Sequence, residues 1–361
     1  MIKVTTFRWQ LDTGGIIFTV MKAWIIDRTC DLKTERHPLK RVDIPKPVPK
    51  PGELLIKVIT CGICHTEIDE IEGRTPPPAH PVVPGHQVVG IVEETRETGN
   101  GIRPGDRVGV AWIWSACGNC FYCLTGHENL CPGFLATGRD VNGGYAEYMT
   151  VPERYAYLIP EFFTDAEAAP LLCAGAIGYR SVLLAGMENG KRIGLTGFGA
   201  SAHLVLNLVR FLYPQSEVFI FARSPDERAF ALELGASWAG DTPDPPPQLL
   251  DCIIDTTPVW TPVVRALEFL RPGGRLVINV IRKEHHDQEV LAHIDYPRHL
   301  WMEKEIKSVA NVTGRDVRDF IRIVADMQFK PEIELYPFEE ANQAVMDIKN
   351  RRIKGAKVLI V

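Results

Sequence analysis

Residues 117–131 read CGNCFYCLTGHENLC, a stretch in which two-residue gaps separate the first three of four cysteines. The four are Cys117, Cys120, Cys123 and Cys131. Four thiolates this close in sequence can close a tetrahedral shell around one zinc ion. Because protein sulfur would fill all four positions, we expect this zinc to be structural, with the chemistry elsewhere in the chain.

The same cysteines could instead form two local disulfides. The metal-like spacing and the lack of a secretory signal favour zinc, and a chain of 361 residues needs no such staples. Nine cysteines in a protein without an export signal also indicate a reducing compartment. We therefore expect a cytoplasmic protein.

The composition sets limits on fold and partners. With 361 residues, of which 45% are hydrophobic, the chain can fill the cores of two domains. A net charge of −5 gives no electrostatic reason to bind nucleic acid or an anionic membrane. The longest apolar runs, such as residues 249–257, have the length of a strand and cannot span a bilayer.

The first twenty residues do not resemble the rest of the chain. They contain Arg8, Asp12 and two adjacent glycines, which do not fit the layout of a signal peptide. A strand-like run begins at Met21. We interpret residues 1–20 as an N-terminal appendage that contributes little to function.

Three residues far apart in sequence form a candidate second metal site. Cys64, His86 and Cys173 are each weak signals alone, but two thiolates and one imidazole are a ligand set that zinc accepts. Three protein ligands leave one position open for a substrate oxygen. As an alternative, Cys61 and Cys64 could form a redox Cys-x-x-Cys pair, although nothing nearby is thioredoxin-like.

A dinucleotide-binding unit is predicted around residue 197. An apolar strand at residues 191–196 leads into a glycine turn, then an apolar helix to about residue 212 and a second strand at 218–221. Gly197 permits the tight turn, Gly199 lets backbone amides approach a pyrophosphate, and Ala202 allows close helix–strand packing. The helix N-terminus would add its dipole to this anion site.

The end of the second strand indicates the choice of cofactor. An NAD-binding chain usually has an acidic residue there, to bond the ribose 2′-hydroxyl. Here the strand is followed by Arg223 and Ser224, which can bind a 2′-phosphate by a guanidinium fork and a hydroxyl. The sequence therefore favours NADP(H), unless Arg223 is a solvated surface arginine.

Together these motifs resemble the zinc-dependent alcohol dehydrogenases of the medium-chain dehydrogenase/reductase superfamily, over nearly all of residues 21–361. The resemblance implies an α/β and β architecture. A GroES-like β-rich catalytic domain would cover residues 21–172 and 306–361, and a Rossmann coenzyme domain with a doubly wound parallel sheet would cover 173–305. It also implies a homodimer or homotetramer.

The resemblance further implies a mechanism. Two zinc ions would bind per chain, and hydride would pass reversibly between an alcohol or aldehyde at the catalytic zinc and NADP(H). Thr66 matches the hydroxyl that bonds the substrate oxygen, and His65 matches a position that faces the cofactor pyrophosphate. Trp112 and Trp114 are candidates for the wall of the substrate pocket, or for core aromatics.

Three positions depart from the family pattern. Gln87 stands where many members have a glutamate near the zinc, which should hinder ligand exchange. Glu67, the expected acceptor for His86, stands where aspartate is commoner. Asp69 stands where many members have a proton-relaying histidine, so the relay would run through Asp69 and water or bypass it.

Two other functions remain open from the sequence. One is an NAD-dependent member of the same superfamily that acts on polyols or formaldehyde adducts. The other, from a different class, is a non-catalytic zinc-ribbon binding protein, against which the complete dinucleotide unit counts.

Overall fold

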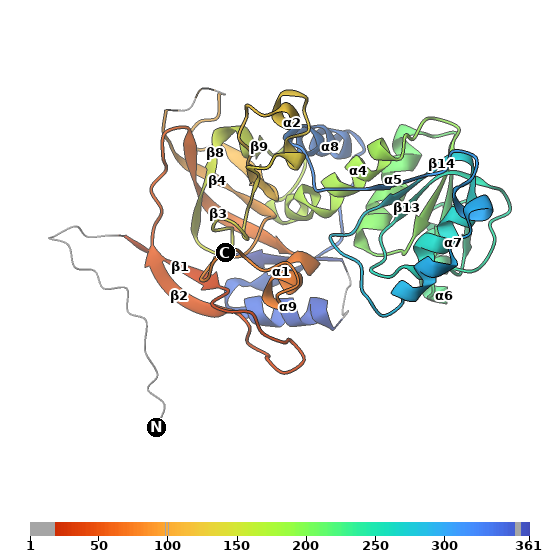
Figure 1. The fold of residues 1–361 in the computed structure, drawn as a ribbon. Helices are drawn as coiled ribbons and strands as arrows, with labels where there is room; N and C mark the ends of the chain where they lie inside the picture. Colours follow the sequence, from red (N-terminus) through yellow and green to blue (C-terminus); the bar gives the residue numbers. More distant parts are fainter. Residues whose placement is uncertain (1–18, 98, 100, 351–354) are drawn as a thin grey trace.

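The computed structural model describes residues 19–97, 99, 101–350 and 355–361 (Figure 1). Most of the expected appendage lies outside this range. The first strand begins at Val20, one residue before the expected start at Met21, and Val20 pairs with Pro45. Among the described residues, no helix is both long and apolar enough to cross a bilayer.

The first lobe is built on β-strands. A seven-stranded sheet has the order β16-β17-β3-β4-β5-β9, with β8 paired to β3. Its strands are β3 (Glu53–Ile63), β4 (Val88–Thr95), β5 (Arg107–Val110), β8 (Tyr148–Pro152), β9 (Ala156–Leu158), β16 (Ile333–Pro337) and β17 (Ala356–Ile360). Two small antiparallel sheets flank it, β1 (Val20–Ile25) with β2 (Lys40–Pro45) and β6 (Ile113–Ser115) with β7 (Leu135–Ala136). We call this the β-rich lobe.

The second lobe contains a six-stranded parallel sheet with the order β12-β11-β10-β13-β14-β15. Its strands are β10 (Arg192–Thr196), β11 (Glu217–Phe221), β12 (Trp238–Gly240), β13 (Leu250–Asp255), β14 (Leu270–Ile278) and β15 (Glu305–Ser308). The central strands are buried because helices cover both faces. The strand order reverses between β10 and β13, and ligands of such sheets bind at that point. We call this the coenzyme lobe.

Nine α-helices connect and cover these sheets in the described part of the chain. They are α1 (His65–Ile71), α2 (Phe121–Leu124), α3 (Asp165–Ala168), α4 (Ala174–Leu184), α5 (Ala200–Leu212), α6 (Pro225–Glu233), α7 (Thr261–Phe269), α8 (Gly314–Asp326) and α9 (Ala341–Lys349). Short 3-10 segments cover Glu128–Leu130, Glu153–Tyr155, Ala169–Leu172, Gln288–His293 and Phe338–Glu340, and a π turn covers Tyr296–Leu300.

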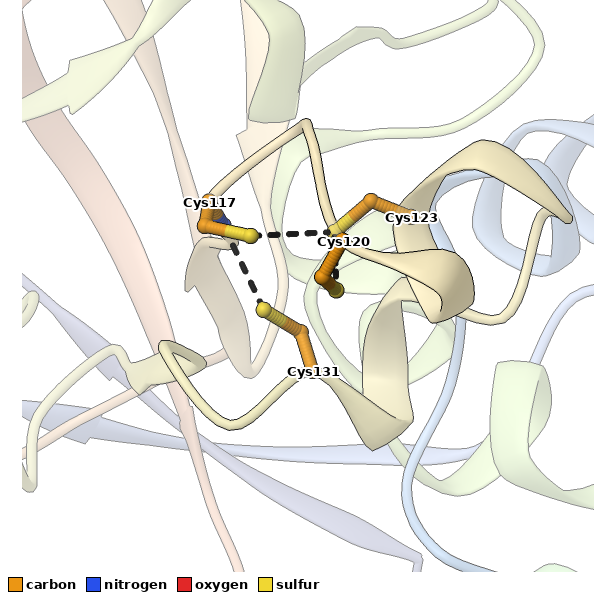
Figure 2. Close-up of side chains that lie close together, drawn as sticks. All are labelled: Cys117, Cys120, Cys123 and Cys131. Carbon is orange, nitrogen blue, oxygen red and sulfur yellow. Dashed lines mark hydrogen bonds between the residues drawn. The ribbon is translucent and has the colours of Figure 1, made fainter.

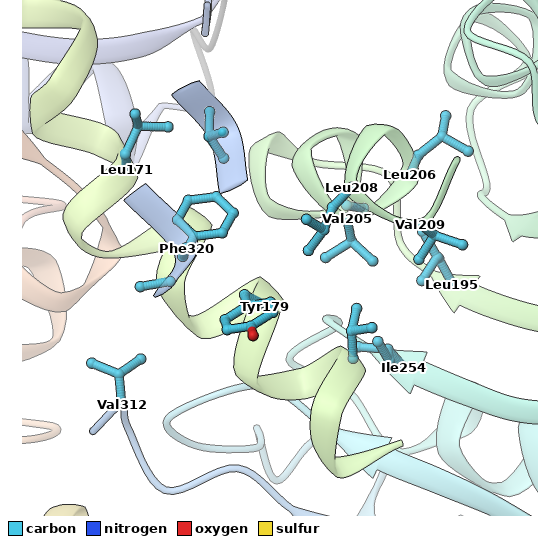
Figure 3. Close-up of a cluster of buried hydrophobic side chains, with 14 of the residues drawn as sticks. Leu171, Tyr179, Leu195, Val205, Leu206, Leu208, Val209, Ile254, Val312 and Phe320 are labelled. Carbon is cyan, nitrogen blue, oxygen red and sulfur yellow. The ribbon is translucent and has the colours of Figure 1, made fainter. Parts of the chain in front are cut away.

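Helix α4 joins the cores of the two lobes. One continuous apolar cluster includes Leu171 and Tyr179 around α4, Phe320 of α8, and Val205 of α5 (Figure 3). A side chain at Gly178 would meet Val205 at 2.9 Å, so this glycine lets α4 and α5 pack closely. The position of α4, which begins just after Cys173, is therefore tied to the first turns of α5.

The observed elements confirm most of the expected strands and helices, with shifts at their ends. The strand expected at residues 191–196 is β10, which begins at Arg192, and the strand expected at 218–221 is β11, which begins at Glu217. Strand β15 pairs with β14 through residue Ser308, so the parallel sheet extends beyond the boundary expected at residue 305. The pairing with β14 assigns residues 305–308 to the parallel sheet, and the expected division of the chain into domains stays a prediction.

Candidate active site

Three side chains from separate elements of the fold converge on one point. Cys64 immediately precedes α1, His86 precedes β4, and Cys173 precedes α4. The Nε2 atom of His86 lies 3.6 Å from Sγ of Cys64 and 3.3 Å from Sγ of Cys173. All three ligand atoms lie within 4.8 Å of one another. This donor set, with three protein ligands, fits a zinc ion that keeps one position open.

Glu67 holds two of these ligands in place. Its Oε2 accepts a hydrogen bond from the backbone amide of Cys64 at 2.8 Å, which forms a capping box at the start of α1. Its Oε1 lies 2.7 Å from Nδ1 of His86, so the ring presents Nε2 to the sulfurs. Glu67 and His86 are almost completely buried. The longer glutamate reaches both partners, which explains how it seats where aspartate is commoner.

The ligand atoms of this cluster hold protons when no metal is bound. A hydrogen bond with Cys173, together with burial, raises the pKa of Cys64 well above its usual value. Burial would lower the pKa of His86, but the Glu67 carboxylate and the Cys64 sulfur raise it well above its usual value. Because zinc binds thiolate and neutral imidazole, a metal ion must displace these protons. Metal affinity should therefore rise with pH.

The redox alternative for Cys61 is not supported by the geometry. Cys61 is fully buried in the apolar core of the β-rich lobe, and its sulfur lies 3.6 Å from the carbonyl oxygen of Gly62. Burial raises the pKa of its thiol well above the usual value. An inert buried thiol of this kind is typical of core packing.

The two tryptophans have different surroundings. The Trp112 ring packs edge-on against His86, with ring centroids 4.8 Å apart. Trp114 instead packs against the core of the β-rich lobe and donates Nε1–H to the carbonyl oxygen of Thr150 at 2.9 Å. The arrangement favours Trp112 as a wall of the site and Trp114 as a core aromatic.

The other residues expected near the metal lie on or beside α1. His65 is exposed at its first position, and the Thr66 amide donates to Sγ of Cys64 at 3.4 Å. Asp69 is buried, and its Oδ1 is bound by the guanidinium groups of Arg74 and Arg282. The Asp69 carboxylate is therefore engaged by two cations, and a proton relay through it stays a prediction.

Gln87 packs away from solvent beside Gly62. Its side chain is buried, and an added Cβ at Gly62 would lie 2.7 Å from Oε1 of Gln87. Whether it slows ligand exchange stays a prediction.

The four cysteines of residues 117–131 also converge (Figure 2). Their sulfurs lie within 4.8 Å of one another, and the sulfurs of Cys120 and Cys123 are 3.6 Å apart. All nine cysteines of the chain are free thiols, so the disulfide alternative is wrong. Backbone amides of Asn119 and Cys120 lower the pKa of Cys117 to about 6, which favours the thiolate that a metal requires. Four sulfurs with no open position fit a structural zinc.

The glycine turn lies between β10 and α5, at the reversal of the parallel sheet. Gly197 has φ +79°, and a side chain there would meet the Thr256 and Thr257 side chains at 3.0 and 3.1 Å. An added Cβ at Gly199, which precedes α5, would enter open space. Ala202 is buried against the sheet. The turn thus has a close-packed back and an open front, as a pyrophosphate site requires.

The turn between β11 and α6 presents cationic groups. Arg223 is exposed, and Ser224 caps α6 by accepting from the Glu227 amide at 3.4 Å. Beneath them, Nη1 of Arg228 donates to the carbonyl oxygens of Ala222 and Arg223 at 2.8 and 2.9 Å. The sequence motifs alone do not indicate a role for Arg228. Its position four residues after the Ser224 cap, on the same face of α6, was the available signal.

The charged residues at the carboxyl edge of the parallel sheet are also not indicated by any sequence motif. Asp255 ends β13, and its carboxylate is paired with Lys283 from the loop after β14. Both side chains are nearly or fully buried. Adjacent cations just after a strand, at the edge where such sheets bind ligands, were the available signal.

Comparisons with known proteins give a consistent result. Residues 50–161 match the family model of the alcohol dehydrogenase GroES-like domain. A probable alcohol dehydrogenase AdhA from Mycobacterium tuberculosis (strain CDC 1551 / Oshkosh) is 41% identical over 346 residues, covering 94% of this chain and 97% of the relative.

Two solved structures share the fold and 25% sequence identity. A cinnamyl alcohol dehydrogenase from Sorghum bicolor aligns with a TM-score of 0.79, over 95% of this chain and 98% of that one. A protein from Sinorhizobium meliloti 1021, solved with bound NADP, aligns with a TM-score of 0.80, over 95% of this chain and all of that one (100%).

Proposed function

Because this chain belongs to the zinc-dependent alcohol dehydrogenases of the medium-chain dehydrogenase/reductase superfamily, we propose that it interconverts alcohols and aldehydes with NADP(H). The observation that carries the proposal is the convergence of Cys64, His86 and Cys173, whose ligand atoms lie within 4.8 Å of one another. We further propose that each chain holds two zinc ions, one there and one in the four-cysteine cluster.

The residues of the three-ligand cluster have distinct roles in this proposal. A zinc ion bound there would act as a Lewis acid, which lowers the pKa of an alcohol and polarises an aldehyde carbonyl. Glu67 fixes the tautomer and orientation of His86 through the 2.7 Å contact to Nδ1. Thr66, anchored by its amide to Cys64, offers a hydroxyl to the substrate oxygen. The ring of Trp112 supports a preference for less polar alcohols and aldehydes.

The turn after β11 supports NADP(H) over NAD(H). Arg223 and Ser224 would bind the 2′-phosphate, and Arg228 donates to the backbone of the turn that carries them. NADP(H) would accept or supply the hydride. Gly197, Gly199 and the start of α5 would receive its pyrophosphate, and His65 would face the same group.

Replacing Arg223 with alanine should weaken NADPH binding about ten- to hundredfold, because a hydrogen bond to a charged group contributes about 1.5–3 kcal/mol and 1.4 kcal/mol is tenfold. NADH lacks the 2′-phosphate, so its binding should hardly change. Fluorescence titration of each cofactor with the wild-type protein and the R223A variant measures both.

The matched control is Arg265→Ala, which removes an arginine of α7 that pairs with Glu268 of the same helix. That variant should bind both cofactors like the wild type. An equal loss of NADPH and NADH binding in R223A would remove the argument for NADP(H). A wild-type preference for NADH would favour the NAD-dependent alternative, including enzymes of polyols or formaldehyde adducts.

Association and location are further parts of the proposal. Strand β15 forms one edge of the parallel sheet and is exposed along its length, with Ile306 44% exposed. An exposed edge strand is a ready surface for pairing, which supports a homodimer or homotetramer built through the coenzyme lobe. Light scattering of the purified chain would determine its mass in solution. Nine free thiols support a reducing, cytoplasmic setting.

The alternative of a non-catalytic zinc-ribbon binding protein is wrong. The similarity to an alcohol dehydrogenase covers 94% of this chain and is not confined to the cysteine-rich loop.

A further inference from the structure

The loop that follows β14 carries two adjacent cations that bind different lobes. Lys283 reaches the carboxyl ends of the parallel strands in its own lobe. Arg282 reaches Asp69 on α1, in the β-rich lobe, across 213 positions of sequence. One short loop therefore contacts both the dinucleotide crevice and the helix that starts at a metal ligand.

Lys283 fixes the loop to the carboxyl end of β13 and the residues that follow it. Its Nζ is paired with Asp255 and donates to the carbonyl oxygens of Thr257 and Val259 at 2.8 and 2.9 Å. The other carboxylate oxygen of Asp255 accepts from the hydroxyls of Thr196 at 2.5 Å and Thr257 at 2.7 Å. The attraction within a buried ion pair offsets the cost of desolvating its charges only when further hydrogen bonds satisfy both groups. The bonds to Lys283 and Asp255 do so here.

Arg282 extends from the Lys283 anchor to α1, the helix capped by the proposed metal ligand Cys64. Its Nε donates to Oδ1 of Asp69 at 3.2 Å, and the Asp69 side chain is 8% exposed. Asp69 lies five residues after Cys64, whose sulfur accepts from the Thr66 amide at the start of α1. A displacement of Asp69 would therefore move the short helix and the ligand at its start.

We infer that Arg282 is a positioning residue. It fixes the distance and orientation of the three-ligand cluster relative to the dinucleotide crevice. The inference rests on the proposed function, in which one lobe carries the alcohol and the other carries the nicotinamide. Hydride transfer needs the reacting atoms about 3–3.5 Å apart, and a shift of about 1 Å can cost about a hundredfold in rate. A direct contact between the lobes can therefore affect the rate by holding the reacting atoms at the right distance.

The tie should contribute little to global stability. A partly exposed ion pair typically contributes little to the free energy of unfolding. Loss of Arg282 should thus leave the fold and both metal clusters in place, and this separates a positioning role from a structural one.

Arg74 provides a matched control. It binds the same oxygen of Asp69 at 2.5 Å, but it lies five residues away on the same lobe. Its other carboxylate partner, Glu72, keeps an ion pair with Lys349 at 2.6 Å when Arg74 is removed. Arg74→Gln therefore removes a cation from Asp69 without cutting the connection between lobes.

The experiment compares Arg282→Gln and Arg74→Gln with the wild type by two readouts. Without cofactor or substrate, hydrogen exchange of the α1 amides should be faster in R282Q than in R74Q. With NADPH and aldehyde, kcat of R282Q should fall at least about tenfold, since displacement of the reacting atoms can cost up to about a hundredfold. The deuterium isotope effect from 4-deuterated NADPH should rise while KM changes less, and R74Q should resemble the wild type.

The inference would be overturned if the α1 amides exchanged as slowly in R282Q as in the wild type. It would also be overturned if they exchanged as fast in R74Q as in R282Q. An unchanged kcat and isotope effect in R282Q would overturn it as well. Failure of the proposed function is distinguishable, because it would appear as a wild-type protein that does not oxidise NADPH with any aldehyde. The exchange measurement would still decide in that case whether Arg282 holds α1.

Discussion

Replacing Cys173 with serine is expected to abolish turnover while leaving the fold intact. Serine is a poor zinc ligand, so only Cys64 and His86 of the three-ligand cluster could bind the metal. Two ligands should bind zinc too weakly to retain it. Lewis-acid stabilisation by a metal is worth several kcal/mol, and 1.36 kcal/mol is tenfold in rate, so the loss should reach at least about a thousandfold. Steady-state aldehyde reduction with NADPH measures the loss, and metal analysis should find one zinc fewer per chain.

The fold should survive because serine replaces cysteine with little change in size, and the backbone bonds stay. The carbonyl oxygen of residue 173 accepts from the Ile177 amide at 2.9 Å, which begins α4. The control is Cys30→Ser, which alters a cysteine outside both clusters and should keep wild-type activity and zinc content. Retained turnover in C173S, with the site zinc verified as absent, would refute the role assigned to this cluster.

Replacing Cys123 with serine is expected to have the largest effect on stability. Its sulfur is buried and accepts a hydrogen bond from the Gly118 amide at 3.3 Å. Burial raises the pKa of its thiol to about 12. Zinc in a four-cysteine site contributes folding free energy directly, with about 10–16 kcal/mol measured for zinc-finger peptides. Because this loop belongs to a larger core, we expect a smaller loss of several kcal/mol.

The effect should spread because the cysteine loop holds neighbouring helices. Glu128 accepts from the Gly314 amide at the start of α8 at 2.9 Å, and Asn129 donates to the carbonyl oxygen of Ala310 at 2.5 Å. Arg180 of α4 donates to Asn129 at 3.4 Å and pairs with Asp316 of α8 at 2.7 Å. A disordered loop would release these contacts.

Thermal unfolding and limited proteolysis of C123S measure this, with Cys30→Ser as the control. The melting temperature should fall by several degrees, and cleavage should appear within residues 117–131. Some turnover should remain in the folded fraction at low temperature, because the three-ligand cluster is separate. An unchanged melting temperature with zinc lost from the loop would contradict the structural role.

The sequence was sufficient for the parts of the site that depend on local spacing. The four cysteines lie within fifteen positions, so short turns alone bring them together. The strand, glycine turn and helix around Gly197 follow from apolar periodicity and the need for positive φ. The widely spaced Cys64, His86 and Cys173 could be grouped only because their chemistry and the family resemblance agreed.

Contacts set by tertiary packing could not be predicted. Nothing local to Asp69 indicates that Arg282 reaches it, because the pairing depends on how the two lobes meet. The buried pair of Asp255 and Lys283 depends on strand order, which places the loop after β14 beside the end of β13. The double role of Glu67 was half predicted: its contact with His86 was expected, and its bond to the Cys64 amide was not.

Zinc stoichiometry measured together with turnover tests the central claim most directly. The purified chain should contain about two zinc ions and reduce simple aldehydes faster with NADPH than with NADH. One zinc per chain without turnover would mean that the four-cysteine cluster holds its metal while Cys64, His86 and Cys173 do not, and would contradict the proposed active site.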